Sequence, residues 1–556
     1  MESRPWIRHY DYNVPPTIRY PRLTLPDLLQ MPVNAYPDKA AIDFLGTEMT
    51  FWELRQQVLR LANALGALGV TKGERVGIHL PTSPQYVIAY FATVSLGAIV
   101  VNLNPMYTSD ELKALAEDTG MTSLITFDMV LPNVRTLCQS VELKRVIVTK
   151  VTDYIKGMPP STAESLEFEP GWHHFSTLIE NCTDTRRPRV ELKPEDPATL
   201  QFTGGTTGVP KGAIITHFNL IAATLQCSLW GNATLLKKPP DSHNVLGVLP
   251  FFHVYGIVVV MNWALFNAAT QILVPRFDLD EFMDILGRYE EITFFPSVAT
   301  MINAIINHPK AEELNLGKKF GVLNSGAAPI AVELIEQIKD MGIFFSEGWG
   351  MTETTSLGIS SPQMGLKKVG SIGIPFPDTD IRLVDVEEGK EDVKKGEPGE
   401  IMIKSPLIMQ GYWNNPEETA NQLKDGWLYT GDIAVMDEDD YFYIVDRKKD
   451  MIIAGGYNIY PREIDEVLYQ HPKIADAVAV GVPDKYRGET VKAYVVLKEG
   501  KTATEKEIIS FCRERLAAFK SPKVVEFRET LPKSTVGKIL RKALRDEEAA
   551  KKNEKD

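Results

Sequence analysis

Residues 203–212 read Thr-Gly-Gly-Thr-Thr-Gly-Val-Pro-Lys-Gly and directly follow an apolar–polar segment, Thr199–Phe202, that predicts a strand. Glycines let backbone N–H groups close around an anion, and the threonine hydroxyls add further donors. Lys211 brings a positive charge to the end of the loop. The spacing is not that of the GxxxxGK[ST] loop of NTPases. Glycine-threonine loops also serve as linkers or tight turns, but this length and the Pro-Lys-Gly ending favour a phosphate-binding loop.

Upstream of this loop, two periodicities alternate. Thr50 and Glu53 form a capping box that begins a helix, whose apolar residues recur at spacings of three and four up to Leu68. The next segments are predicted, in order, as strand 75–80, helix 83–96, strand 98–103, helix 109–118 and strand 123–127. Strands that alternate with helices indicate a parallel sheet with helices on its faces.

Length and composition limit the class of protein. The 556 residues exceed the usual domain of about 150 residues several-fold, so more than one domain is expected. With 44% hydrophobic and 24% charged residues, the chain is neither disordered nor fibrous. A net charge of −13 argues against a nucleic-acid binder. The four cysteines are too widely spaced for a metal site or a disulfide framework, which favours a reducing compartment.

Neither a secretory signal nor a membrane span is expected. The first 16 residues contain no apolar core of the kind that signal peptides need. Residues 254–275 carry no charged side chain, but Asn262, Asn267, Thr270 and Gln271 interrupt the apolar run. We therefore predict a buried helix followed by a strand.

The chain changes character near residue 400. Short strands, 400–404 and 441–445, lie among turns, and residues 446–556 then have helices and strands of their own, including 463–470, 477–482 and 491–497. This last part carries 24 Lys and Arg against 19 Asp and Glu, whereas residues 1–445 carry a net −18. A small cationic unit beside an anionic one suggests a lid over a polyanionic substrate, although chance variation in surface charge would look the same. The charged tail from Lys542 is expected to fray.

Five motifs in a fixed order make the chain resemble a known family. After the loop at 203–212 come Gly348-Trp-Gly-Met-Thr-Glu353, Tyr429-Thr-Gly-Asp432, the stretch 446–461 that begins Asp-Arg-Lys-Lys-Asp, and Pro532-Lys-Ser-Thr-Val-Gly-Lys538. Over residues 25–545 this pattern resembles the adenylate-forming enzymes, which include acyl- and aryl-CoA synthetases, luciferases and peptide-synthetase adenylation domains.

The resemblance implies a mixed α/β (α+β) fold in two domains. Residues 1–445 would form a large AMP-binding domain of layered, parallel-rich sheets and helices with a small β-subdomain. Residues 446–556 would form a small, mobile C-terminal α+β lid that carries the catalytic lysine, with the hinge at Asp446.

By the same resemblance, ATP and Mg²⁺ would bind along the motifs. Lys538 would stabilise the charge of the transition state, and Glu353, with a hydroxyl such as that of Thr206, would ligate Mg²⁺. Asp432 would accept from the ribose hydroxyls, Arg447 would reach the ribose or phosphate, and Trp349 would stack on the adenine. The remaining nucleotide-binding residues are Thr203, Gly204, Gly205, Thr206, Thr207, Gly208, Lys211, Gly326, Ala327, Ala328, Gly348, Gly350, Met351 and Thr352, with Thr203 also expected to take part in catalysis. Gly455, Gly456 and Tyr457 would line the path of CoA.

The acid substrate is less sharply defined. Residues 250–256, Pro-Phe-Phe-His-Val-Tyr-Gly, lack the Asp that holds the amine in amino-acid adenylation domains, which disfavours amino acids. His253 resembles a residue close to the substrate carboxylate, and Tyr255, Ile257, Asn324 and Ser325 are expected in the pocket. Runs such as 104–108, Asn-Pro-Met-Tyr-Thr, resemble bacterial long-chain fatty-acid–CoA ligases. Some of these carry a gating Trp where this chain has Ile257.

The sequence therefore predicts a cytoplasmic ligase that uses ATP, CoA and a fatty acid, and no nucleic acid. A medium-chain or aryl acid remains an alternative substrate, and transfer to a carrier protein or non-catalytic lipid binding are more distant alternatives. Peripheral contact with the inner membrane and a homodimer remain open.

Overall fold

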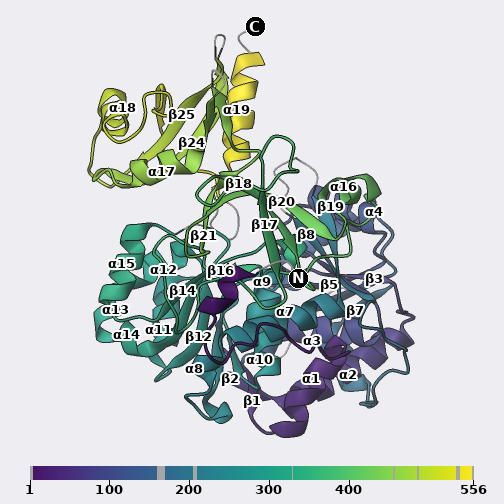
Figure 1. Ribbon diagram of the computed structural model, residues 1–556. Coiled ribbons are helices and arrows are strands. Elements are labelled where there is room, and N and C mark those ends of the chain that lie inside the picture. Colours follow the sequence, from purple (N-terminus) through teal and green to yellow (C-terminus); the bar gives the residue numbers. More distant parts are fainter. Residues whose placement is uncertain are drawn as a thin grey trace.

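The computed structural model describes residues 4–158, 169–203, 210–328, 330–454, 457–484, 487–533 and 539–553. Two large sheets, a small antiparallel sheet and a C-terminal sheet organise the chain. Figure 1 shows the C-terminal part, with α17, α18, β24, β25 and α19, stacked on the larger body formed by the preceding residues.

A seven-stranded sheet contains the alternating segments predicted from the sequence. Its order is β7 (Trp172–His174), β6 (Arg145–Thr149), β5 (Ser123–Phe127), β3 (Arg75–Ile78), β4 (Ile99–Asn102), β8 (Pro197–Thr203) and β9 (Lys211–Thr216). All neighbours are parallel except β8 and β9, which form an antiparallel pair whose last partners are Thr203 and Lys211. The parallel arrangement is therefore confirmed, and the loop 203–212 joins two paired strands.

A nine-stranded sheet is built mainly from residues 244–375, with two strands from residues 40–50 at one edge. Its order is β16 (Ile374–Pro375), β15 (Ile359–Ser360), β14 (Phe345–Trp349), β13 (Phe320–Ser325), β12 (Ile292–Ser297), β10 (Asn244–Gly247), β11 (Thr270–Leu273), β1 (Ala40–Phe44) and β2 (Thr47–Thr50). The central strands from β14 to β1 are parallel, so their carboxyl ends lie at one edge. Ligands bind at that edge in open α/β sheets.

Helices cover both large sheets. They are α1 (Leu25–Ala35), α2 (Phe51–Ala67), α3 (Pro84–Ser95), α4 (Ser109–Thr119), α5 (Leu131–Cys138), α6 (Phe175–Asn181), α7 (His217–Trp230), α8 (Asn232–Leu235), α9 (Val254–Gly256), α10 (Trp263–Phe266), α11 (Leu279–Gly287), α12 (Ala299–Ile306), α13 (Lys310–Glu313), α14 (Leu316–Lys319) and α15 (Val332–Asp340). Short turns of 3-10 helix are η1 (Pro5–His9), η2 (Asp128–Val130), η3 (Val151–Tyr154), η5 (Pro240–Ser242) and η7 (Thr352–Thr354), and η6 (Ile257–Asn262) is a π-helix.

The capping box predicted at the start of α2 is present, because Thr50 Oγ1 accepts from Glu53 N and the Glu53 carboxylate accepts from Thr50 N.

The uncharged segment 254–275 folds as predicted, as helix and then strand. Residues 254–266 form one helical run through α9, η6 and α10, and β11 follows. The residues of η6 are at most 2% exposed, so their apolar side chains belong to the protein core. Among the described residues, no helix combines the length and the apolar character that crossing a membrane requires.

The small antiparallel sheet forms next. It comprises β17 (Asp380–Val384), β18 (Gly399–Lys404), β20 (Trp427–Met436) and β19 (Leu423–Lys424), with β21 (Phe442–Arg447) also paired to β20, and α16 (Pro416–Gln422) beside it. The C-terminal sheet comprises β23 (Tyr457–Ile459), β22 (Ile452–Ala454), β25 (Gly488–Leu497), β24 (Ile474–Asp484) and β26 (Val524–Phe527), with α17 (Pro461–Tyr469), α18 (Glu505–Arg513) and α19 (Arg541–Asn553). Its hydrophobic clusters contain only residues from 452 onwards.

The prediction that the charged tail from Lys542 frays is wrong. The segment forms the helix α19 as far as Asn553. Ion pairs with the C-terminal sheet hold the helix: Glu548 pairs with Lys492 at 2.9 Å, and Glu547 pairs with Arg528 at 2.7 Å. Charge density suggested a solvated tail, but the charges have partners that are distant in the sequence.

Candidate active site

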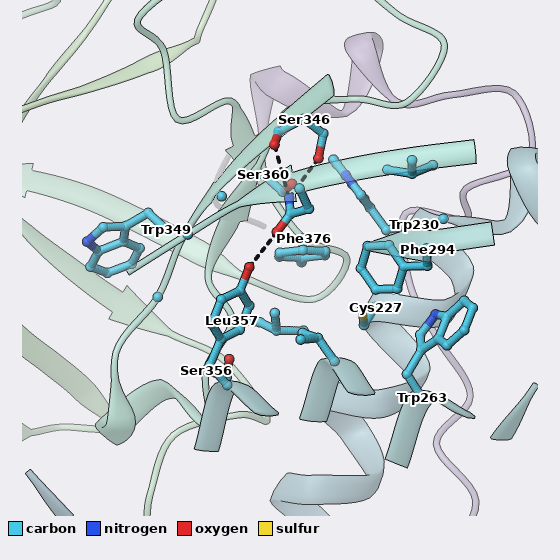
Figure 2. A pocket seen from close by; sticks show the side chains of 18 of the residues that line it. Cys227, Trp230, Trp263, Phe294, Ser346, Trp349, Ser356, Leu357, Ser360 and Phe376 are labelled. Carbon is cyan, nitrogen blue, oxygen red and sulfur yellow. Dashed lines mark hydrogen bonds between the residues drawn. The ribbon is translucent and has the colours of Figure 1, made fainter. Parts of the chain in front are cut away.

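A cavity lies at the carboxyl ends of strands β12, β13 and β14, against helices α7 and α10 (Figure 2). The empty space between its walls, including the part open to solvent, is about 880 Å³. Its walls are mostly aromatic and aliphatic, and they include Trp230, Leu235, Val259, Trp263, Phe294, Val322, Leu357, Ile359 and Phe376. Such a space suits an apolar ligand with a few polar anchoring groups.

A chain of hydrogen bonds forms one polar wall (Figure 2). Tyr255 Oη donates to Asn324 Oδ1 at 2.7 Å, and Asn324 Nδ2 donates to Ser346 Oγ at 2.8 Å. Burial raises the pKa of Tyr255, so its hydroxyl keeps its proton. A Cβ at Gly326 would lie 2.9 Å from Tyr255 Oη, so a side chain at position 326 would displace the tyrosine. The wall therefore requires a glycine at this point.

His253 lines the same cavity and is neutral. Its segment is anchored from the seven-stranded sheet and its helices, since Gln201 Nε2 donates to Phe252 O at 2.8 Å and Tyr86 Oη donates to Phe251 O at 2.8 Å. His253 Nδ1 accepts from Tyr255 N at 3.2 Å, which leaves the ring proton on Nε2. Burial lowers the pKa of His253 to about 4. The side chain therefore offers the cavity a neutral N–H donor.

Trp349 lines the cavity, and Asp432 and Arg447 lie next to it on two further strands. Trp349 Nε1 donates to Asp432 Oδ2 at 2.8 Å, and Arg447 Nε lies 3.0 Å from Asp432 Oδ1. Asp432 is 5% exposed, and its charge raises the pKa of Arg447. Asp432 thus contacts both Trp349 and Arg447, the two other residues predicted to bind the nucleotide here.

Glu353 lies on η7, directly after the strand that carries Trp349, and is 6% exposed. Tyr412 Oη donates to Glu353 Oε1 at 2.7 Å. Burial raises the pKa of Glu353 above its ordinary value. A buried carboxylate with a single side-chain hydrogen bond within the described residues retains the capacity to bind a cation.

Lys211 begins β9, and its Nζ forms an ion pair with Glu418 on α16. The same Nζ lies 5.5 Å from the centroid of the Tyr412 ring. The lysine at the end of the glycine-threonine loop therefore lies beside the residue that contacts Glu353.

Several predicted residues cannot be placed. Gly204, Gly205, Thr206, Thr207, Gly208, Gly455, Gly456 and Lys538 lie outside the described residues, and for Tyr457 the structure describes only the backbone, at the start of β23.

The other predicted residues lie around the cavity or behind it. Gly326, Ala327, Gly348, Gly350 and Met351 line the cavity, whereas Ser325, Ala328 and Thr352 are their chain neighbours and Thr203 ends β8. Ile257 is fully buried in the core and is not among the lining residues. Ala327, Thr355 and Ser356 have positive φ values of 67°, 48° and 81°, and such backbone strain often occurs at functional sites.

Sequence reasoning missed much of the apolar wall. Cys227, Trp230, Leu235, Trp263, Gln363 and Phe376 line the cavity but belong to no motif. Trp263 packs against Phe294 with ring centroids 5.0 Å apart. No local pattern distinguishes such residues from ordinary core residues, so the sequence contained no signal that could have found them.

Two family models match this chain. Residues 29–413 match the AMP-binding enzyme family, and residues 463–538 match the AMP-binding enzyme C-terminal domain. A long-chain-fatty-acid–CoA ligase of Bacillus subtilis is 40% identical over 559 residues, covering 99% of each chain.

Two solved structures share the fold. An anthranilate CoA ligase, AuaEII, in complex with anthranoyl-AMP has a TM-score of 0.84 at 26% identity, covering 96% of this chain and 98% of the other. An o-succinylbenzoate CoA synthetase of Bacillus subtilis in complex with ATP and magnesium has a TM-score of 0.77 at 27% identity, covering 93% and 99%. Because the family matches cover most of the chain, this protein belongs to the AMP-binding enzymes.

Proposed function

We propose that this protein is an AMP-forming acid–thiol ligase that makes acyl-CoA from a long-chain fatty acid. The observation that carries the proposal is an apolar cavity lined by Trp349, which contacts Asp432 beside Arg447. An acyl chain in that cavity would place its carboxylate next to a nucleotide bound at Trp349 and Asp432. The name of the Bacillus subtilis relative supports the substrate class.

The reaction would proceed in two steps. In the first, a carboxylate oxygen of the acid attacks the α-phosphorus of ATP, the bond to the β-phosphate bridge breaks, and pyrophosphate leaves. In the second, the CoA thiolate attacks the acyl carbon, and AMP leaves with the bonding electrons. Neutral His253 would donate a hydrogen bond from its Nε2–H to a substrate oxygen and keep its proton, so it adds no charge to the cavity.

Lys211 and the 203–212 loop would hold the β- and γ-phosphates, and Lys538 would stabilise the charge that grows in the first step. Mg²⁺, when bound, neutralises phosphate charge. Glu353 fits as its protein ligand, together with the hydroxyl of Thr206. Mg²⁺ keeps several waters and needs only one or two carboxylates, so Glu353 suffices although the described residues contain no cluster of three ligands.

The second step requires Lys538 to move away from the thiol. We propose that residues 446–556 rotate against residues 1–445 about Asp446, which brings Gly455, Gly456 and Tyr457 to the path of CoA. The carboxylate of Asp446, on β21, accepts from the adjacent Arg447 N and from Arg462 N in α17, both at 2.7 Å, so it links β21 to α17.

We also propose a cytoplasmic location, since ATP and CoA are cytoplasmic substrates and the four cysteines, which the structure describes, are unpaired. Fractionation of cells would test the location and any peripheral membrane contact, and light scattering would determine whether the protein is a dimer.

One experiment tests the proposed activity. Purified protein with Mg²⁺, ATP and CoA is given palmitate, hexanoate or benzoate, and AMP and acyl-CoA are measured. We expect palmitate to exceed the two shorter acids in kcat/KM by about tenfold or more, because each buried CH₂ contributes about 0.8 kcal/mol. A higher kcat/KM for hexanoate or benzoate than for palmitate would mean that the substrate is a medium-chain or aryl acid. If no acid gave AMP, the ligase function would be excluded.

A further inference from the structure

Tyr412 connects the two charged residues of the nucleotide site. Its segment runs antiparallel to strand β9, since Ile214 N donates to Gly411 O at 2.9 Å and Trp413 N donates to Gly212 O at 2.7 Å. The chain that starts at Lys211 therefore places Tyr412 next to the end of the phosphate-binding loop. The residue is 4% exposed, so its ring is held by packing.

The hydroxyl of Tyr412 has two acceptors and one proton. Its Oη lies 2.7 Å from Glu353 Oε1 and 2.7 Å from Gln422 Oε1. Gln422 Nε2 donates to Glu418 at 3.1 Å, which turns its carbonyl oxygen toward the tyrosine. A charged carboxylate is a stronger acceptor than an amide, so the proton of Tyr412 points to Glu353.

Lys211 completes the arrangement. Its ammonium group pairs with Glu418 and lies above the Tyr412 ring, so the tyrosine stands between a cation and an acid. Glu353 Oε1 is thereby fixed, and Glu353 accepts no other side-chain hydrogen bond within the described part of the chain. Tyr412 holds one oxygen of the carboxylate in place, and no side chain of the described residues donates to the other.

We infer that Tyr412 is a positioning residue: its hydroxyl orients Glu353 so that the free carboxylate oxygen faces the cation that accompanies ATP. This inference rests on the proposed function, because it gives Glu353 the metal. The tyrosine acts through Glu353 and needs no contact with the substrates.

The test is the variant Tyr412→Phe, which removes only the hydroxyl and keeps the ring beside Lys211. Calorimetry measures binding of ATP with Mg²⁺ and, separately, with EDTA. We expect binding of magnesium-ATP to weaken by about tenfold, since hydrogen bonds to charged groups are the stronger ones, while metal-free ATP binds as in the wild type. The Mg²⁺ concentration that gives half-maximal pyrophosphate release should rise in parallel.

Tyr443→Phe is the matched control, because its hydroxyl also donates to a carboxylate, Asp437 at 3.2 Å, but outside the cavity. It should leave both forms of binding unchanged. Unchanged magnesium-ATP binding in Tyr412→Phe, or equal weakening with and without Mg²⁺, would overturn the inference.

A double-mutant cycle provides a second measurement that does not depend on the size of the first effect. In a Glu353→Gln background the hydroxyl has no charged carboxylate to orient, so Tyr412→Phe should add no further loss of magnesium-ATP binding. Additive losses would mean that Tyr412 acts independently of Glu353. A wild-type protein that binds no ATP and forms no AMP would instead refute the proposed function itself.

Discussion

His217 is the first residue of helix α7, and its imidazole is only 1% exposed. Its Nδ1 accepts from Leu25 N at 3.2 Å and so joins the start of α7 to the start of α1. Burial lowers the pKa of His217 to about 4, as it does for His79 and His253. These imidazoles are neutral near pH 7 and resist protonation while the chain is folded.

The variant His217→Asn tests the cost of that burial. Between the ordinary pKa of 6.5 and the folded value of about 4, the unfolded chain binds a proton that the folded chain cannot, so stability falls as the pH falls. From pH 7 to pH 5 this group should cost the wild type about 2 kcal/mol, a loss that asparagine avoids. Urea unfolding of both proteins at pH 7 and pH 5 measures the difference, and identical pH dependence would contradict it.

Lys538→Ala tests the role proposed for the terminal lysine. The ammonium should matter only in the first step, where charge grows on the phosphate, so the variant should lose acyl-adenylate formation by about a hundredfold or more. Thioester formation from supplied acyl-adenylate should remain within a few-fold of the wild type. Equal loss of both steps would argue against two arrangements of the small domain.

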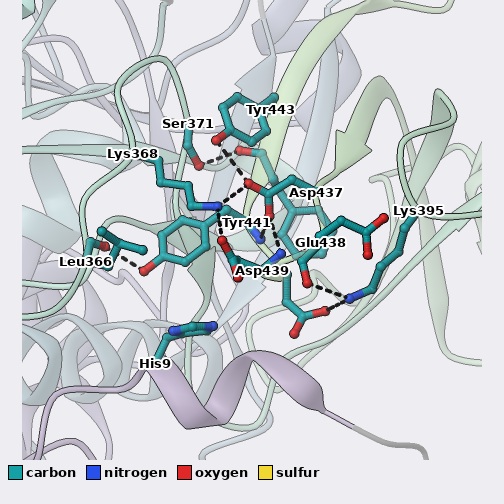
Figure 3. Close-up of polar contacts among 12 residues, drawn as sticks. His9, Leu366, Lys368, Ser371, Lys395, Asp437, Glu438, Asp439, Tyr441 and Tyr443 are labelled. Carbon is teal, nitrogen blue, oxygen red and sulfur yellow. Dashed lines mark hydrogen bonds and ion pairs between the residues drawn. The ribbon is translucent and has the colours of Figure 1, made fainter.

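At the scale of elements, the turn between β20 and β21 shows how the segments of the body are held together (Figure 3). Lys368 Nζ lies 2.6 Å from both Asp437 and Asp439, and Tyr441 Oη donates to Leu366 O at 2.6 Å. The carboxylate of Asp440 is fully buried and pairs with Lys395 at 2.5 Å and with Arg8 at 2.9 Å. The acidic side chains of this turn are thus neutralised by two lysines and an arginine.

Replacing Lys395 with methionine tests how much its ion pair with Asp440 stabilises the fold. The change keeps most of the side-chain volume but leaves the buried Asp440 with Arg8 as its ion-pair partner, so the free energy of unfolding should fall by about 2 kcal/mol. Lys390→Met is the control, since the Lys390–Glu388 pair is more than 70% exposed on both sides and should contribute less than about 0.5 kcal/mol. Urea unfolding measures the loss of stability in both variants. Equal losses in Lys395→Met and Lys390→Met would show that burial of Asp440 does not strengthen its ion pair.

At the scale of the whole molecule, the segment after Asp446 is tied to the large body. Arg447 pairs with Asp432, and Lys448 Nζ lies 2.9 Å from Glu400, whose side chain is 6% exposed. Lys448 N also donates to Gly431 O at 2.8 Å. A rotation about Asp446 would have to break some of these contacts, so they favour the present arrangement over any other.

Lys448→Met should therefore shift the balance between the two proposed arrangements. Losing a partly exposed ion pair changes an equilibrium by about threefold, so the ratio of ATP–pyrophosphate exchange to thioester formation should change by about that factor. Lys404→Met, on the neighbouring strand β18, should leave the ratio unchanged. An unchanged ratio in Lys448→Met would mean that this contact does not distinguish the arrangements.

Much of this molecule could be predicted because the responsible signals are local. Helix α2 follows from its capping box and apolar spacing. The order of the motifs likewise predicted the family before any contact was known. Such features depend on residues a few positions apart, whose interactions the sequence displays directly.

The tertiary structure alone decided which side chains meet. Tyr412 contacts Glu353, which lies 59 positions earlier in the chain, and Trp349 contacts Asp432, 83 positions later. Trp263 and Phe376 line the same cavity although they belong to separate elements. The charged tail forms helix α19, whose Glu548 and Glu547 pair with Lys492 and Arg528 of the C-terminal sheet. The free energy of these contacts depends on burial and distance in the folded chain, and neither quantity can be read from the order of residues.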